Sequence, residues 1–213
     1  MDTIYTVDQM KQKCLEAVER FGDISKEEVN RFIANVDIDS VSKAANLIQD
    51  AEKKGNRIHI TGIGKPAHVA TYIASLFSST GTPTYFLHGT EAVHGSCGQL
   101  VQGDIVIAIS NSGETAELKA TVVAVKKNGC KIIGVSGNSE SWLAKESDAF
   151  LYAGVSQEGG PLNRAPRSSI IVEIYVLQVL SVYLQAERNL TPQEYVLRHP
   201  GGKLGELREN ERA

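Results

Sequence analysis

A cluster of short hydroxyl and amide side chains around a glycine follows an apolar run in the middle of the chain. The run, Asp104–Ile109, is too short for a helix and is typical of a strand buried on both faces. A helical pattern covers Glu114–Lys127, and the loop residues around its start are Ser110, Asn111, Ser112, Gly113 and Thr115. This order would gather free backbone N–H groups, hydroxyl donors and the positive end of a helix dipole, which suits a phosphate group. An ordinary N-cap is the alternative, but the donors exceed what one cap needs.

A second glycine-containing loop, Gly62–His68, follows the apolar run Arg57–Thr61. Its two glycines, Gly62 and Gly64, would let the backbone approach a ligand closely. The match to a dinucleotide-binding fingerprint is short, so it is weak support for such a cofactor. Lys65 could place its ammonium against a phosphate or a sugar oxygen, and a solvated lysine is an equally good interpretation.

Titratable side chains occur in three further segments. His88 and His94 lie close together, but no third and fourth ligand stands at the spacing of a metal site, so we predict no metal. Contact with a polar ligand and incidental surface positions both remain open for them. Glu158 is the only carboxylate of a long turn-rich loop, and such loops are often functional. His199 is fixed by a His-Pro-Gly-Gly turn, where it could cap a helix or enter an active site.

The elements that must position these groups alternate between strand and helix after residue 56. Such alternation predicts a parallel sheet with helices on both faces, and ligands of such sheets bind beyond the carboxyl ends of the strands. The loops after Thr61, Leu87, Ile109 and Tyr152 are therefore the ones expected to carry the site. The expected strands are Arg57–Thr61, Thr84–Leu87, Asp104–Ile109, Lys131–Val135 and Ala149–Tyr152.

Helices are expected before and after this core. Capping pairs at Thr6 and Ser25, with a break at Phe21–Asp23, predict two N-terminal helices, and a third should cover Ser40–Lys54. The apolar helix Ser168–Ala186 should be the main core helix. We expect the glutamate inside it, Glu173, to be structural and satisfied by a partner.

Composition and charge exclude several function classes. The 213 residues suit one domain with appended helices, and a net charge of −3 gives no electrostatic case for nucleic acid or an anionic membrane as partner. The apolar stretch Ile170–Leu184 falls short of a membrane span. Met1–Tyr5 lacks the pattern of a secretion signal, and three cysteines at no metal-ligand spacing fit a reducing cytoplasm.

Several motifs, taken together in this order, resemble the sugar isomerase (SIS) domain family, and within it most closely the arabinose-5-phosphate isomerases. The resemblance covers about residues 40–208. The motifs are Thr61–Lys65 with Thr80–Pro83, His88–Gly95, Ile109–Glu114, Ala165-Pro166 and Arg198–Gly205.

This resemblance implies a three-layer α/β/α sandwich with a five-stranded parallel sheet of flavodoxin-like order, assembled as a homotetramer, that interconverts an aldose phosphate and its ketose without a required cofactor. It implies one SIS domain over residues 1–213, with a helical extension (1–55), an α/β core (56–190) and a C-terminal tail (191–213). The phosphate-binding positions that it implies are Ser110, Asn111, Ser112, Gly113, Thr115 and Gly64. Its acid, base and polar positions are Lys65, His94, Glu117, Glu158 and His199.

The chain departs from the family pattern at two places near this site. Pro66 stands where serine is common, and Arg167 adds a positive charge before the last long helix. The regulatory CBS pair often found downstream does not occur in the printed sequence. An enediol mechanism needs a base and an acid or cation near the carbonyl oxygens, and we expect Glu158 as base, His199 or His94 as acid and Lys65 as the cation. A hexulose-6-phosphate isomerase and a non-catalytic sugar-phosphate sensor are the alternatives.

Overall fold

The computed structural model describes residues 6–212, so the expectation about Met1–Tyr5 lies outside the described residues. Its centre is a five-stranded sheet in which every neighbouring pair is parallel, in the order β2-β1-β3-β4-β5. The α/β class and the flavodoxin-like order are confirmed. The strands are β1 (Ile58–Gly62), β2 (Thr84–Phe86), β3 (Ile105–Ile109), β4 (Lys131–Ser136) and β5 (Ala149–Tyr152).

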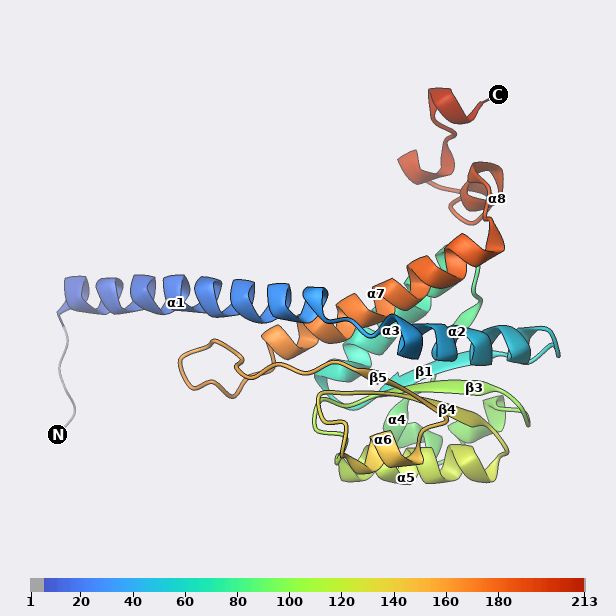
Figure 1. Cartoon of the computed structure of the whole chain (residues 1–213), viewed down its shortest axis with the longest axis horizontal. Coiled ribbons are helices and arrows are strands. Elements are labelled where there is room, and N and C mark those ends of the chain that lie inside the picture. Colours follow the sequence, from blue (N-terminus) through green and yellow to red (C-terminus); the bar gives the residue numbers. More distant parts are fainter. Residues whose placement is uncertain (1–5, 213) are drawn as a thin grey trace.

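Helices cover both faces of the sheet, which gives three layers (Figure 1). The isoleucines of β1 and β3 alternate with residues that face the other way, so each face has its own apolar cluster. One cluster packs under α2 (Ile38–Glu52), α3 (Lys65–Ser79) and α7 (Ser168–Arg188), and the other under α4 (Gly89–Ala92), α5 (Ala116–Lys127) and α6 (Trp142–Glu146). A short 3-10 helix, Ser96–Gln99, follows α4.

The prediction of two separate N-terminal helices is wrong. A single helix, α1 (Val7–Ala34), runs through Gly22, and its first half projects beyond the α/β core (Figure 1). Thr6 forms the expected capping box with Gln9. A glycine inside a helix costs only about 1 kcal/mol, and no proline enforces a break. The pair expected to start a second helix serves tertiary contacts instead, because Ser25 and Glu28 both bind residues near the start of α7.

The last long helix, α7, extends two residues beyond its expected end. At 21 residues it is long and apolar enough to cross a membrane by length and composition, so the expectation that this stretch falls short is wrong. Its buried residues pack in the core against α2 and α3, as a core helix of a globular domain would. Glu173 lies among them without a hydrogen-bond partner in the described part of the chain, so the expected satisfying partner is absent.

The C-terminal segment lies apart from the sheet, beyond the end of α7 (Figure 1). It contains α8 (Pro192–Leu197), which begins with the predicted capping box of Thr191 and Glu194, and two short 3-10 turns, Lys203–Gly205 and Glu209–Glu211.

Candidate functional site

The loops that carry the hydroxyl cluster and the glycine pair meet at the centre of the sheet edge. β1 and β3 are neighbours, but α3 follows β1 onto one face, whereas α5 follows β3 onto the other. A crevice is formed where the strand order reverses in this way, and it is where ligands of open α/β sheets bind. The short helix α4 reaches the same point, because the hydroxyl of Thr121 on α5 donates to the carbonyl of Gly89.

The helix that starts at the hydroxyl cluster has a free N-terminus. Thr115 is the N-cap of α5, but its side chain makes no capping hydrogen bond and lies 3.1 Å from the hydroxyl of Ser110. The hydroxyl of Ser112 accepts from the N–H of Glu114 at 3.2 Å and keeps its own proton for a ligand. The interpretation of this cluster as an ordinary cap is therefore wrong. The first N–H groups of α5 and two hydroxyls converge on one place that suits an anion.

A network behind the loop holds it in this shape. The carboxylate of Glu114 accepts from the N–H of Trp142 at 2.7 Å and from Lys119 at 2.5 Å, and these hydrogen bonds, Lys119 first, lower its pKa. Ser136 donates to the carbonyl of Asn111 at 3.1 Å. Gly113 has φ of +66°, and its carbonyl accepts from the N–H of Leu143 on α6. The loop shape thus depends on α6, which the sequence pattern around Ser110 does not reveal.

The start of α3 forms the opposite wall of the crevice. Gly64 is its N-cap with φ of +65° and offers no side-chain cap, so this helix also presents an open N-terminus. Lys65 is the first residue of the helix and is exposed. Pro66, the departure from the family pattern, fits the first turn, where a missing N–H costs little.

The two histidines near α4 differ in their freedom. The Nδ1 of His88 accepts from the N–H of Glu91 and so caps α4. His94 follows α4 and is exposed, as is Glu117 in the first turn of α5. Within residues 6–212 no group of three or more His, Cys, Asp or Glu side chains could hold a metal ion.

Glu158 lies at the start of α7, on the loop after β5. It is nearly buried, and its Oε2 accepts from the N–H of Arg167 at 2.6 Å and of Ser169 at 3.2 Å. The carboxylate therefore caps α7 from outside the helix, which fixes its position and leaves Oε1 without a partner among these contacts. Asn163 supports the same loop by accepting from the N–H of Glu158 at 2.7 Å.

Helix α1 holds this loop in place, a role that no sequence pattern indicated. Glu28 is 3% exposed, pairs with Arg31 and accepts from the N–H of Ser156 at 2.9 Å. The hydroxyls of Ser25 and Ser168 lie 3.4 Å apart. The only local signal at Glu28 was its capping-box spacing, which pointed to a different structure.

His199 does not join the other predicted site residues within one chain. It follows α8, stacks on Tyr195 and has its Nδ1 2.9 Å from the carbonyl of that residue. The neighbouring Arg198 lies near Gly81, just before β2, and therefore at the amino ends of the strands. The 21 residues of α7 place about 30 Å between this region and Glu158.

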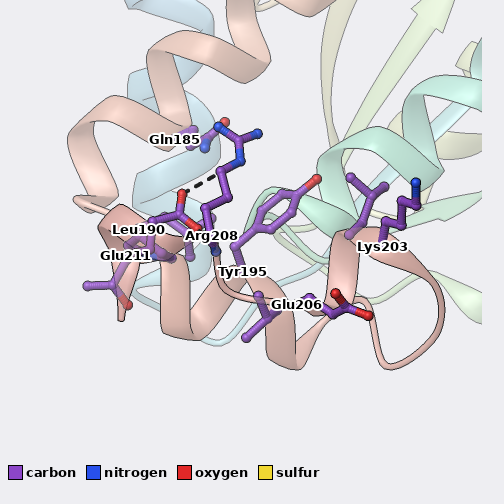
Figure 2. A pocket seen from close by; sticks show the side chains of 11 residues that line it. Gln185, Leu190, Tyr195, Lys203, Glu206, Arg208 and Glu211 are labelled. Carbon is purple, nitrogen blue, oxygen red and sulfur yellow. Dashed lines mark hydrogen bonds and ion pairs between the residues drawn. The ribbon is translucent and has the colours of Figure 1, made fainter. Parts of the chain in front are cut away.

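A hollow of about 470 Å³ lies in this distant region, between the end of α7, α8 and the C-terminal turns (Figure 2). Lys203 and Arg208 line it together with Glu206 and Glu211, and Glu211 accepts from the N–H of Arg208 at 2.9 Å. Because both signs of charge are present, this hollow has no electrostatic preference for a phosphate.

Comparisons with known proteins agree with this geometry. The family model described as SIS domain matches residues 52–183. Arabinose 5-phosphate isomerase KdsD of Pseudomonas aeruginosa is 37% identical over 191 residues, which are 90% of this chain and 57% of the relative. The protein of the same name from Escherichia coli K12 is 39% identical over 149 residues, 70% of this chain and 45% of the relative. The chain thus spans about half the length of these curated relatives.

A solved structure matches over most of both chains. It is the protein c3406 of E. coli CFT073 in complex with arabinose 5-phosphate, and it superposes with a TM-score of 0.78 at 34% identity, covering 89% of this chain and 98% of the other. The family-model match and this coverage confirm the resemblance drawn from the motifs. The chain belongs to the SIS domain family.

Proposed function

We propose that this chain is a phosphosugar aldose–ketose isomerase, of the type that interconverts D-arabinose 5-phosphate and D-ribulose 5-phosphate through an enediol. The observation that carries the proposal is the uncapped N-terminus of α5 beside the Ser110 and Ser112 hydroxyls, at the point where the strand order reverses. The printed names of the relatives support the reaction and the sugar.

The phosphate would bind at the loop Ser110–Thr115. The N–H groups of the first turn of α5 and the hydroxyl of Ser112 supply donors, and the helix dipole favours the negative charge. Asn111 and Gly113 shape the loop, and Gly64 lets the backbone of the facing loop approach the sugar. The proposed reaction requires neither a metal nor an organic cofactor, because side chains supply both the acid and the base.

The proton transfer would use groups that reach the carbonyl end of the open-chain sugar. Glu158 is our candidate base, because α7 and Asn163 hold its carboxylate in a fixed position. Lys65 would stabilise the negative charge of the enediolate, and His94 and Glu117, both exposed near the crevice, would serve in ring opening or oxygen protonation.

His199 can take part only if a second copy of the chain delivers it, since its own chain holds it far from Glu158. We propose a homotetramer for this reason. The first half of α1 supports the idea, because it exposes an apolar stripe at helical spacing that includes Val7, Met10 and Val18. The three free thiols fit a cytoplasmic location, and the net charge of −3 fits a small-molecule substrate rather than nucleic acid or membrane as the partner.

A non-catalytic sugar-phosphate sensor is the competing function. It is favoured by the use of Glu158 as a helix cap and by the absence of His199 from the crevice of its own chain. A hexulose-6-phosphate isomerase would use the same phosphate loop with a longer sugar.

One experiment separates these functions. The protein is mixed with a panel of aldose and ketose phosphates in D₂O, and loss of the C2 proton signal is followed by NMR. An isomerase exchanges that proton for deuterium, and the sugar that exchanges fastest identifies the substrate. Binding without exchange across the panel would establish the sensor. Exchange that is lost in a Ser112→Ala, Thr115→Ala double variant would tie the reaction to the phosphate loop.

A further inference from the structure

Glu173 is a buried carboxyl group that the proposed reaction does not use. It lies in the second turn of α7 and is 0% exposed, and neither of its side-chain oxygens has a hydrogen-bond partner within residues 6–212. Buried polar groups in folded proteins are nearly always hydrogen-bonded, and one left without a partner destabilises the fold. A carboxyl group in such a position therefore requires an explanation.

Its neighbours on α7 connect it to Glu158. Val176 and Leu177 follow one turn later and are buried in the apolar core. Ser169 precedes Glu173 by one turn, so both side chains lie on the same face of the helix. The hydroxyl of Ser169 is also buried without a partner among the described residues, and its N–H donates to Oε2 of Glu158 at 3.2 Å. Glu158, Ser169 and Glu173 thus form one polar group at the buried start of α7.

Glu173 holds a proton at neutral pH. Burial, and next the negative charge of Glu158, raise its pKa to about 8. No cation of the described residues offsets this effect. On α1, Arg31 pairs with Glu28, and the side chains of Lys43 on α2 and of Lys65 and His68 on α3 are exposed. On α7 itself, Arg167 is exposed and Arg188 pairs with Glu52 at the far end, and the sheet presents only apolar residues on this face.

We propose that Glu173 is a positioning residue for Glu158, a buried acid that stays uncharged so that Glu158 is the single carboxylate at the start of α7. When Glu173 loses its proton, two carboxylates repel each other in dry surroundings, and Glu158 can no longer rest against the N–H groups of α7 as an available base. This role rests on the proposed isomerase function. It also accounts for the retention of a group that costs stability, as is common at functional sites.

The first test is the pH dependence of turnover in Glu173→Gln. With the wild-type protein, kcat should fall about tenfold per pH unit above the pH at which Glu173 ionises. The variant carries an uncharged amide of the same shape, so this alkaline fall should disappear while KM stays within about twofold. Glu187→Gln is the matched control, since it makes the same change at an exposed position of the same helix. Its profile should follow the wild type.

The second test needs no substrate. An unfolded glutamate loses its proton near pH 4.5, but folded Glu173 keeps it to about pH 8, so the native state binds more protons between these values. Raising the pH through this window should lower the Tm of the wild type but not of Glu173→Gln. Their Tm difference should therefore widen from pH 5 to pH 8 and level off above it. Glu173→Met, close in volume and apolar, should behave in the same way if the amide folds poorly.

A carboxyl ¹³C NMR titration reads the contact with Glu158 directly. The Glu158 signal should show a second step at the pH at which Glu173 titrates, and this step should vanish in Glu173→Gln. A Glu158 signal without that step, a constant Tm difference, or an alkaline fall that persists in Glu173→Gln would each overturn the proposal. If no sugar phosphate reacts but the NMR step is present, the isomerase function has failed while the carboxyl pair stands, so the two failures can be told apart.

Discussion

The glycine at the turn of the phosphate loop, Gly113, is the position where one added methyl group should do most damage. It has φ of +66°, and a Cβ atom there would overlap the Cβ and Oγ of Ser141 and lie 2.9 Å from Oγ of Ser136. Neither serine can yield easily, because Ser141 caps α6 and Ser136 donates to Asn111. The substitution Gly113→Ala should therefore displace the loop itself.

The magnitude follows from two contributions. A non-glycine residue in the left-handed region costs about 1–2 kcal/mol, and overpacking of a filled site costs about 1–3 kcal/mol, so Gly113→Ala should lose about 2–5 kcal/mol of unfolding free energy. Gly55→Ala is the control, since Gly55 has φ of +76°, lies at the end of α2 and has no atom within 4 Å of the added Cβ. It should lose only the first contribution.

The two variants should also differ in substrate affinity. Displacing the loop removes one or two charge-assisted hydrogen bonds to the phosphate, worth about 1.5–3 kcal/mol each, so the Kd of Gly113→Ala for a sugar phosphate should rise roughly tenfold to a hundredfold. Gly55→Ala should bind like the wild type. Urea unfolding and isothermal titration calorimetry measure both quantities. Equal stability losses in the two variants, or an unchanged Kd in Gly113→Ala, would refute the reasoning.

Three further predictions concern other parts of the chain. Glu158→Gln keeps an oxygen acceptor for the N–H groups of α7 but cannot take a proton, so kcat should fall by roughly a hundredfold or more with little loss of stability; near-normal turnover would remove it as base. Burial, against the opposing charge of Asp104, lowers the pKa of His59, so its contribution to stability should be complete above about pH 6.5 and lost as the pH falls below that value. The free energy of unfolding of wild type minus His59→Gln should therefore shrink from pH 7 to pH 5, and a constant difference would contradict this. Val18→Asp, at a side chain 68% exposed on α1, should yield a smaller species in light scattering, and an unchanged mass would take α1 out of the subunit interface.

Local patterns predicted the elements well where the side chains themselves decide the structure. α3 (Lys65–Ser79) and β5 (Ala149–Tyr152) have the bounds expected from the sequence, and the other strands differ by one residue at an end. Periodicity and glycine or proline punctuation suffice for such elements, because burial of one face or of both faces imposes the pattern directly.

Tertiary contacts explain what the sequence did not predict. Ser25 and Glu28 read locally as the start of a second helix, but they bind the loop before α7, which lies more than a hundred residues away. The same holds for Glu158, whose partners are N–H groups of α7, and for Glu173, whose lack of a partner among residues 6–212 depends on the packing around it. The distance of His199 from the crevice depends on the length and direction of α7, which no motif encodes.

The most direct measurement is a crystal structure of the protein with D-arabinose 5-phosphate. Our account predicts the phosphate group at the start of α5, with its oxygens about 3 Å from the hydroxyl of Ser112 and from N–H groups of the first helical turn. A phosphate bound in another place, such as the hollow beside Lys203 and Arg208, with the turn from Ser110 to Thr115 empty, would contradict it.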